Sequence, residues 1–411
     1  MKIKSGKMKQ FPLDLQALSA IKEKTALSRK FIRTKDEEVR KQYNRARNKV
    51  SKLVKRARKQ YENTLASETK SNPKRIWQYI NAKRKIKQGI GDLCSDPRDE
   101  KSKKTDNDEE KADILANYFS SVFTHEPAGE PPTLEARQVE VNWSNMTIQE
   151  IEIAKLLKNL KPDKSPGLDN LHPTFLKELH QELATPLSII FNKSLSEKQI
   201  PKEWKKAKIS AIFKKGSKFM ASNYRPVSLT SVVCKVMEKL IRNHIVKFMT
   251  TNNHFTKKQY GFMAGRSTAL QLLKVIDEWT EAIDNGCGID CIYMDYQKAF
   301  DTVPHRRLIE KLKAYRIGPN MIEWIEDFLS SRKQQVSVGG QSSKWHNVSS
   351  GIPQGSVIGP LLFIIFINDL PDAVDSTVYL FADDTNIFNL IKSKEDKITL
   401  QKDLEKLSQM D

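Results

Sequence analysis

Cysteine is scarce in this sequence, and its arrangement argues against a disulfide framework and against a zinc site built on cysteine pairs. Only four cysteines occur among the 411 residues. The one close pair, Cys287 and Cys291, has three residues between its members and no second pair or histidine cluster near it, as such a metal site would need. We therefore expect reduced thiols and no disulfide-linked partner.

A long apolar run is missing as well. The longest one, Val357–Ile367, contains Gly359 and Pro360 and is too short to span a bilayer. The first residues show no charged leader followed by an apolar core and a cleavage site of small residues. We therefore expect an intracellular protein without a membrane partner.

Acidic residues are rare in the first hundred positions, where the charge of the chain is concentrated. This part holds 28 Lys and Arg against 11 Asp and Glu, a net charge of +17, whereas the remaining 311 residues contribute only +3. A local cationic excess favours a polyanionic partner, and a phosphate backbone is the commonest one. An anionic membrane surface remains the competing interpretation, and solvated helix faces account for part of the charge.

The basic segment, residues 1–91, predicts a long amphipathic helix. A capping-box pattern at Thr34 and Glu37 begins it, and Asn72-Pro73 ends it. Apolar residues recur at helical spacing between these points. They are Val39, Tyr43, Ala46, Val50, Leu53, Ala57, Tyr61 and Leu65.

Two further segments follow. Residues 92–141 are polar, acidic and interrupted by Pro and Gly, with one helical stretch near Ala112–Phe123, so we expect a linker. The main domain occupies residues 142–411 and opens with a helix at Thr147 and Glu150. Apolar stretches separated by helical ones predict an α+β fold there. The expected strands are Ile209–Phe213, Gly288–Met294, Gln334–Val338 and Thr377–Phe381.

The most informative pattern is a pair of acids inside an apolar segment. Tyr379–Phe388 has β-forming residues on both sides of Asp383 and Asp384, which predicts a hairpin with the carboxylates at its bend. A lone Asp-Asp pair is more often only a turn. A second apolar strand, however, delivers Asp295 at its end, before a helix that begins near Pro304.

Carboxylates gathered from two strand ends repel one another unless cations lie between them. Mg²⁺ suits such a site because it takes oxygen ligands and is often shared between one or two carboxylates and a substrate phosphate. Two Mg²⁺ ions, or Mn²⁺ in their place, can activate a 3′-hydroxyl and stabilise a departing pyrophosphate. The pattern therefore indicates polymerase chemistry.

Five segments in order turn this indication into a family resemblance. They are Asn223–Thr230, Gln259–Phe262, Tyr293–Asp301, Ser350–Ser356 and Phe381–Asp384. Together they resemble the motifs of LINE-type, non-LTR retrotransposon reverse transcriptases, closest to the Jockey and chicken-repeat groups. The resemblance covers residues 142–411, and the basic segment before it resembles the connector between endonuclease and polymerase in those proteins.

The resemblance implies the fingers and palm of a right-hand polymerase, truncated before the thumb and lacking the upstream endonuclease. Its implied partners are an RNA template, a DNA primer and deoxynucleoside triphosphates. The implied function is RNA-directed DNA polymerisation, in the nucleus or in a cytoplasmic ribonucleoprotein. Two other interpretations stay open: another right-hand polymerase, such as an intron maturase or an RNA-templated RNA polymerase, and a catalytically inactive nucleic-acid-binding remnant.

The resemblance also implies roles for single residues near the metal ions. Asp295 and Asp383 resemble the metal-bridging pair, and Asp384 the third carboxylate. Arg225 resembles the arginine that contacts the incoming triphosphate, because a guanidinium forks onto phosphate oxygens. Lys214 or its neighbour in the chain, Lys215, adds a second cation, and the sequence does not say which.

Further roles follow for the nucleotide pocket. Phe300 resembles the ring that excludes a ribose 2′-hydroxyl, although a core position is the simpler interpretation. Gln354 and Gly355 resemble the loop that borders the pocket, although Gly355 could equally serve a turn. Asp301 could cap the following helix or take part in the site.

Overall fold

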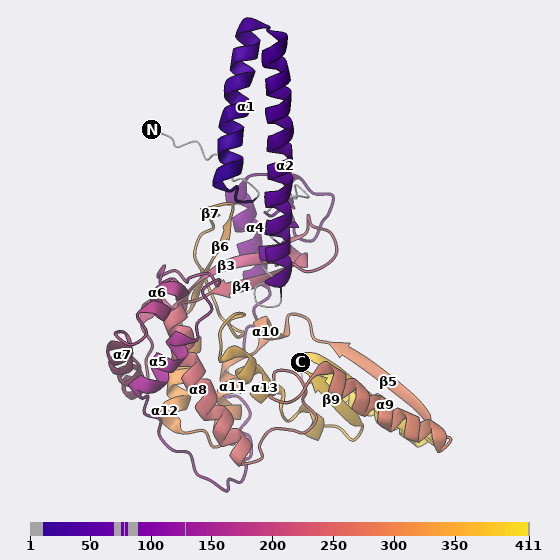
Figure 1. Cartoon of the computed structure of the whole chain (residues 1–411). Coiled ribbons are helices and arrows are strands. Elements are labelled where there is room, and N and C mark those ends of the chain that lie inside the picture. Colours follow the sequence, from indigo (N-terminus) through magenta and orange to yellow (C-terminus); the bar gives the residue numbers. More distant parts are fainter. Residues whose placement is uncertain (1–10, 70–74, 78, 81–88, 128, 410–411) are drawn as a thin grey trace. The chain divides into compact units, whose positions relative to one another are not determined.

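The computed structural model describes residues 11–69, 75–77, 79–80, 89–127 and 129–409. The chain divides into two compact units, Met1–Gly89 and Ile90–Asp411. Helices occur in both units, and the strands of the described residues gather into sheets within the second unit, so the fold is α+β (Figure 1).

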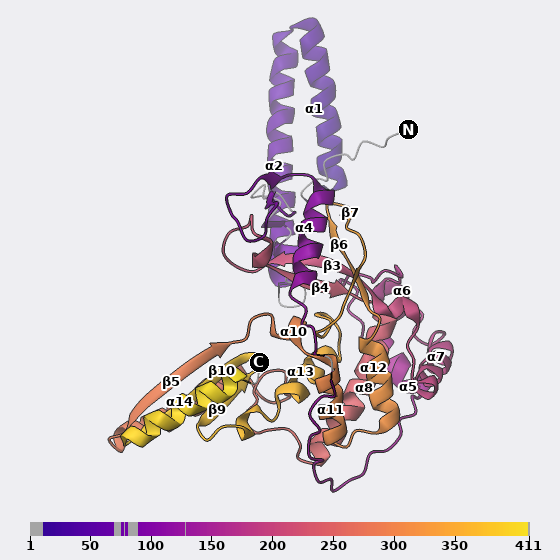
Figure 2. The same ribbon diagram turned by 180° about the vertical axis from the view of Figure 1, so that it is seen from behind.

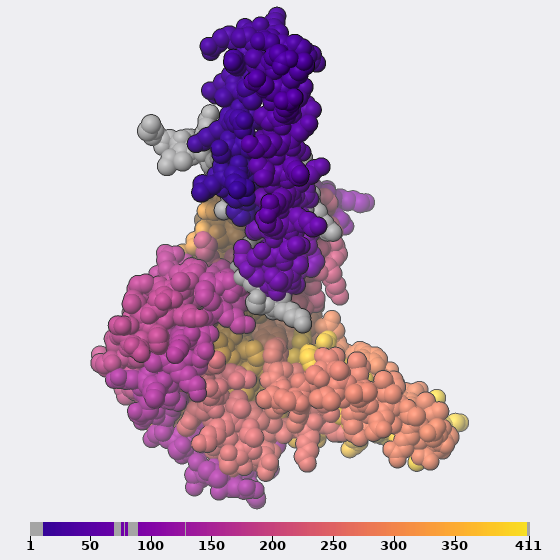
Figure 3. All heavy atoms as spheres, in the orientation of Figure 1, coloured from indigo at the N-terminus to yellow at the C-terminus, as the bar shows by residue number. Residues whose placement is uncertain are grey.

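The first unit contains a helical hairpin. Helix α1 (Leu15–Thr34) and helix α2 (Glu37–Ser67) are joined by two residues and lie side by side in both ribbon views (Figures 1 and 2). Small residues of α1, Ala17 and Ala20, are buried against α2, which lets the two helices approach closely. Atoms of the two helices meet along the length of the hairpin (Figure 3).

The start of α2 differs from the expected capping box. Thr34 is the last residue of α1, and its hydroxyl donates to the Lys30 carbonyl at 3.1 Å. Asp36 caps α2 instead, because its carboxylate accepts from the backbone N–H of Glu38 at 2.8 Å. The apolar stripe of α2 is buried as expected at Val39, Ala46, Val50, Ala57 and Leu65. The predicted end at Asn72-Pro73 lies outside the described residues.

The first large sheet of the second unit has strand order β4-β3-β6-β7, with β8 also paired to β6. Strands β3 and β6 run parallel, whereas the other neighbours are antiparallel. The strands are β3 (Lys206–Phe213), β4 (Tyr224–Leu229), β6 (Lys333–Val338), β7 (Gln341–Ser342) and β8 (His346–Asn347). Short 3₁₀ turns, Lys202–Lys205 and Ala221–Asn223, precede β3 and β4.

Helix α4 (Asp108–Ser121) packs on this sheet, which differs from the linker expected over residues 92–141. Leu115 and Phe119 are buried in one cluster with Ile209 of β3 and Val336 of β6. A two-stranded ribbon, β1 (Leu93–Cys94) and β2 (Lys104–Thr105), precedes the helix. The segment is polar on average because only one face of α4 is apolar, and that face is sufficient to dock it.

A helical core follows the sheet. Its largest cluster joins side chains of α5, α7, α8, α11, α12 and α13, with Trp324 stacked on Phe328 at its centre. The helices are α5 (Glu150–Lys158), α6 (Pro173–Glu178), α7 (Ala184–Glu197), α8 (Val232–Thr251), α11 (His305–Ala314), α12 (Pro319–Leu329) and α13 (Gly359–Ile367). Helix α5 is the first helix of the main domain. Its capping box is formed by Gln149 and Glu152, and not by Thr147 and Glu150 as expected.

A buried carboxylate fixes the start of α13. Glu238 of α8 has no exposed surface, and it accepts from the backbone N–H of Val357 at 2.5 Å and of Ile358 at 3.1 Å. These donors are the N-cap residue Ile358 and the residue before it, at the helix end where backbone N–H groups have no partner inside the helix. Negative charge at a helix N-terminus also complements the helix dipole.

The second large sheet has strand order β5-β10-β9 and is antiparallel throughout. Its strands are β5 (Gly288–Asp295), β9 (Thr377–Phe381) and β10 (Asp384–Ile391). Helix α9 (Thr268–Asp284) covers one face and helix α14 (Lys394–Gln409) the other, as the two opposite views show (Figures 1 and 2). Alternate side chains of β9 serve the two faces: Val378 packs towards α14 and Tyr379 towards α9.

All four expected strands are confirmed, three of them with a small extension at one end and Thr377–Phe381 as predicted. The helix expected near Pro304 is α11, for which Pro304 is the N-cap residue. Two short helical elements, α10 (Ala299–Thr302) and the 3₁₀ turn Leu370–Asp372, complete the second unit. The four cysteines are free thiols. None of the helices in the described residues combines the length and apolar character needed to cross a membrane.

The Glu238 contact yields a prediction of stability. Glu238→Ala should lower the free energy of unfolding by about 3 kcal/mol, because it leaves buried N–H groups without an acceptor. Chemical denaturation followed by circular dichroism measures this change. The exposed Glu326 on α12 provides the matched control, and Glu326→Ala should change the same quantity by less than about 0.5 kcal/mol. Equal stability of the two variants would contradict the role given to Glu238.

Candidate active site

Two strand ends bring carboxylates together. Strand β5 ends at Asp295, strand β10 begins at Asp384, and these two residues lie directly opposite each other in the antiparallel ladder. Opposite residues in such a ladder have Cα atoms about 4.5–5.5 Å apart. Asp383 precedes Asp384 in the bend, where Ala382 has a left-handed φ of 56°. The hairpin with acids at its bend is therefore present.

Gln259 holds this bend in place. Its buried side-chain oxygen accepts from the backbone N–H of Gly261 at 2.7 Å and of Ala382 at 2.9 Å. A Cβ on Gly261 would collide with the backbone nitrogen of Ala382. The motif Gln259–Phe262 thus has a physical explanation: its amide and its glycine let the chain pass close to the turn that carries Asp383.

A cavity of about 510 Å³, here called the central cavity, lies at this point. Its volume is in the range of pockets that bind small organic ligands. It brings together seven of the eight residues singled out from the sequence. They are Lys214, Arg225, Asp295, Phe300, Gln354, Gly355 and Asp383.

Asp384 is the exception, because it lines a second cavity of about 260 Å³ beside α9. Asp295 lines both cavities, while Asp383 lines only the central one. Asp383 lies in the bend and Asp384 is the first residue of β10, so the two neighbouring carboxylates line different cavities. The expected convergence of three carboxylates on one pocket is therefore present for two of them.

The charges of the three acids act on one another. Partial burial raises the pKa of Asp384, and the neighbouring Asp383 and Asp295 carboxylates raise it further. Lys214 and Arg225 act in the opposite direction on the same pKa. Acids and bases of the site therefore lie within electrostatic reach of one another.

The donor chemistry of Asp295 and Asp383 fits a divalent cation with oxygen ligands. Among the described residues, no group of three or more Asp, Glu, His or Cys side chains is arranged to hold an ion. Mg²⁺ commonly binds through one or two carboxylates and completes its shell with waters and substrate phosphates. The carboxylates of Asp295 and Asp383, which line one cavity, are consistent with this mode of Mg²⁺ binding.

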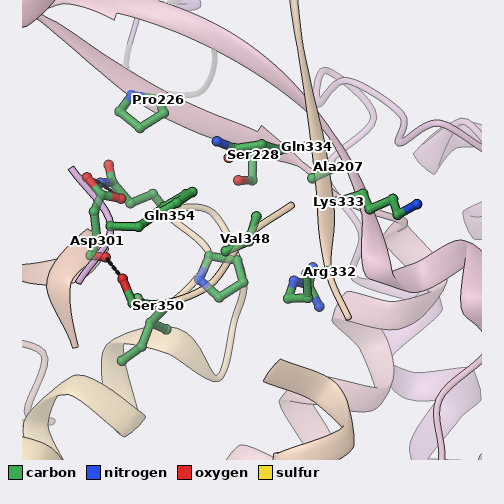
Figure 4. Close-up of a pocket in the computed structure, with 14 residues that line it drawn as sticks. Ala207, Pro226, Ser228, Asp301, Arg332, Lys333, Gln334, Val348, Ser350 and Gln354 are labelled. Carbon is green, nitrogen blue, oxygen red and sulfur yellow. Dashed lines mark hydrogen bonds between the residues drawn. The ribbon is translucent and has the colours of Figure 1, made fainter. Parts of the chain in front are cut away.

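The loop Ser350–Ser356 connects strand β4 with the short helix α10 at the cavity. The Gln354 amide donates to both carboxylate oxygens of Asp301 at 2.9 Å, and the Ser350 hydroxyl donates to the Asp301 carbonyl at 2.8 Å (Figure 4). The Gln354 carbonyl in turn accepts from Ser228 of β4 at 2.7 Å. Gly355 has a φ of 116°, and a Cβ there would lie 2.6 Å from the Ser228 carbonyl oxygen.

Asp301 thus serves to anchor the loop. It is buried, and burial raises its pKa to about 6, while the Gln354 hydrogen bonds and Lys298 act to lower it. The carboxylate also lines the central cavity.

Phe300 lies between the helical core and the central cavity. It stacks on Phe363 of α13, with ring centroids 4.4 Å apart and planes at 16°, and meets Phe262 edge to face at 6.1 Å. Its carbonyl accepts from Ile352 at 2.7 Å. The ring is partly buried and still lines the cavity, so its position accommodates both interpretations.

Lys214 and Lys215 both line the central cavity. Only the charge of Lys214 acts on the pKa of Asp384 and of Lys298. Of the two lysines, Lys214 is therefore the one whose charge reaches these two groups.

The sequence reasoning missed the positions of Gln259 at the bend and of Lys298 at the cavity. Both lie inside segments that carried the resemblance, and Lys298 lines the central cavity. The available signal for Lys298 was its position three residues after Asp295.

Comparison with known proteins agrees with this geometry. Residues 212–410 match the family described as reverse transcriptase (RNA-dependent DNA polymerase). The chain is 32% identical over 371 residues to the probable RNA-directed DNA polymerase from transposon BS of Drosophila melanogaster, covering 87% of this chain and 40% of that protein.

Two further relatives are similar to this chain. The RNA-directed DNA polymerase from mobile element jockey of Drosophila melanogaster is 32% identical over 303 residues, 69% of this chain and 32% of that protein. Its counterpart in Drosophila funebris is 28% identical over 389 residues, 90% of this chain and 41% of that protein. The chain therefore spans less than half the length of each of these relatives.

Asp301 yields a prediction of pH dependence. Because its pKa rises from 3.8 to about 6 on folding, the folded protein holds the proton more tightly, and stability is lost as pH rises through this window. The free energy of unfolding should fall by about 2 kcal/mol more in the parent than in Asp301→Asn between pH 4 and 6. Urea unfolding at a series of pH values measures this difference.

The exposed Asp284 at the end of α9 provides the control, and Asp284→Asn should retain the fall seen in the parent. A parent and an Asp301→Asn variant with parallel pH profiles would show that this carboxyl does not titrate as described.

Proposed function

This chain carries a reverse transcriptase domain of the non-LTR retrotransposon kind, and on that premise we propose that it copies RNA into DNA by two-metal nucleotidyl transfer. The observation that carries the proposal is the central cavity, which is lined by both acids and cations. Asp295 and Asp383 line it together with Lys214 and Arg225. A nucleoside triphosphate needs both, because its metal ions require carboxylates and its phosphates require cations.

In the proposed reaction, the primer 3′-hydroxyl gives its proton to water and its oxygen bonds to the α-phosphorus of the nucleotide. The bond from this phosphorus to the bridging oxygen breaks, and pyrophosphate leaves with that electron pair. Bound Mg²⁺ or Mn²⁺ would supply positive charge at the attacking and departing oxygens. Asp295 and Asp383 would hold these ions, and Asp384 would add negative charge from the neighbouring cavity.

Arg225 and Lys214 would bind the phosphates that are not transferred. A guanidinium offers paired N–H donors in a fixed plane, and Arg225 is exposed to the cavity at the start of β4. Phe300, fixed by its stack on Phe363, would face the sugar and admit deoxyribose. Gln354 and Gly355 would border the base, in a loop that Asp301 anchors.

We assign the two sheets to the parts of a right-hand polymerase. The sheet β4-β3-β6-β7 would form the fingers with α4, and the sheet β5-β10-β9 would form the palm with α9 and α14. The packing of α4 supports the inclusion of residues upstream of Asn142 in the polymerase domain. The first unit would be the basic connector.

Primer extension on an RNA template tests the function. Asp383→Asn should lower the rate of deoxynucleotide incorporation about a hundredfold or more, because several kcal/mol of charge stabilisation are lost. Binding of the primer–template, measured by fluorescence anisotropy, should stay near the parent value. Asp290→Asn is a matched control, since Asp290 is exposed on the same strand as Asp295 and outside both cavities. Full activity of Asp383→Asn would refute the assignment.

The inactive nucleic-acid-binding remnant remains a second candidate, favoured by the first unit. Arg45, Lys52, Arg56 and Lys59 recur along one side of α2, are exposed, and form no ion pair among the described residues. Fourteen residues of helix extend about 21 Å, long enough to follow several phosphates. A parent protein that binds primer–template without extending it would favour this candidate.

Salt dependence tests the stripe on α2 for either candidate. Replacing Arg45, Lys52 and Arg56 by Gln should reduce the slope of log affinity against log salt by about 2–3, because each phosphate contact releases counterions. Anisotropy titrations of the whole chain with an RNA duplex measure this slope. A control variant with Lys158, Lys239 and Lys247 replaced by Gln removes the same charge from exposed positions of α5 and α8. Equal slopes in both variants would contradict a role for the stripe.

A further inference from the structure

Lys298 occupies a constrained position between Asp295 and Phe300. It is the N-cap residue of α10 and has a left-handed φ of 55°, a conformation that is unfavourable for residues with a Cβ. Its carbonyl accepts from the N–H of Asp301 at 2.7 Å and of Thr302 at 3.2 Å. The backbone therefore directs this side chain in a fixed way.

The ammonium group of Lys298 has no carboxylate partner among the described residues. Its Nζ atom lies 5.3 Å from the centre of the Tyr118 ring, on α4. The carboxylate of the buried Asp301 accepts from the side-chain nitrogen of Gln354 at both of its oxygens. An aromatic face attracts a cation but does not neutralise it. A half-buried positive charge is thus left without an ion-pair partner within 4 Å among the described residues, and Asp301 acts on it only from a longer distance.

Two further cations share its surroundings. Lys298, Lys214 and Arg225 line the central cavity together, and none of the three forms an ion pair among the described residues. Burial lowers the pKa of Lys298, and the charges of Lys214 and Arg225 lower it further, whereas Asp301 raises it. Like charges held this close repel one another until an anion lies between them.

We propose that Lys298 is a third phosphate-binding residue of the central cavity, which grips the polyphosphate of a nucleoside triphosphate together with Lys214 and Arg225. Tyr118 supports the ammonium group from α4, on the side away from the anion. This assignment rests on the proposed function, because it takes the nucleotide as the ligand. It goes further in naming a cation beyond Arg225 and Lys214 and a helix that supports it.

Inorganic tripolyphosphate is the direct probe, since it carries the charge of the nucleotide without base or sugar. Titration calorimetry at low salt, with EDTA to remove metal ions, measures its affinity for the whole chain. Lys298→Met should weaken this affinity about tenfold or more, whereas Lys298→Arg should retain most of it. Lys158→Met, at an exposed position of α5, should match the parent. Near-ultraviolet circular dichroism checks that the variants are folded.

The proposal would be overturned if the parent bound no tripolyphosphate. It would also be overturned if folded Lys298→Met bound tripolyphosphate with the affinity of the parent. Weaker binding of RNA duplex with unchanged tripolyphosphate binding would also overturn it, in favour of a nucleic acid backbone as the ligand.

Primer extension separates this proposal from the proposed function. In an active parent, Lys298→Met should raise KM for deoxynucleotides about tenfold and leave the affinity for primer–template unchanged. An unchanged KM would reject the role of Lys298 and leave the polymerase assignment intact. A parent that extends no primer, but loses tripolyphosphate binding on Lys298→Met, would reject the polymerase assignment and support the anion site.

Discussion

The antiparallel ladder between β5 and β10 is the constraint on which the candidate site depends. It runs from Gly288 opposite Ile391 to Asp295 opposite Asp384. A slip by one residue would turn every side chain to the other face. The register is held because both faces of the sheet are covered, by α9 through Val275 and by α14 through Leu400 and Leu407. Apolar packing along a strand of about 23 Å therefore decides where the carboxylates lie.

A second set of contacts brings the cations to these acids. Arg225 lies on β4 of one sheet and Asp295 on β5 of the other. The loop Ser350–Ser356 bridges them, bonded to Ser228 on one side and to Asp301 on the other. Glycine at 355 permits this close approach, since a side chain there would meet the Ser228 carbonyl. The cavity is thus assembled from segments far apart in sequence by backbone contacts that only small residues allow.

The strands and the acids at their ends could be predicted from the sequence because an apolar run followed by Asp is a local signal. The start of α2 could not, since Thr34 and Asp36 are both good N-cap residues and the local sequence does not distinguish between them. The placing of Asp384 in a separate cavity also depends on tertiary structure, namely the position of α9. The neighbours of Lys298 are Lys214, which follows β3, and Arg225 of β4, and they come near it only in the folded chain.

The docking of α4 has a consequence for where an autonomous polymerase fragment can begin. The family resemblance begins at Asn142, but a fragment starting there would lack Leu115 and Phe119. The side chains of Ile209 and Val336 that these residues cover would then be exposed to water. Such a surface promotes self-association of the shortened protein. It would also lack the ring of Tyr118 that faces Lys298. A helix in a stretch of mostly polar composition is therefore part of the minimal folding unit, and fragments for crystallisation should begin before β1 at Leu93.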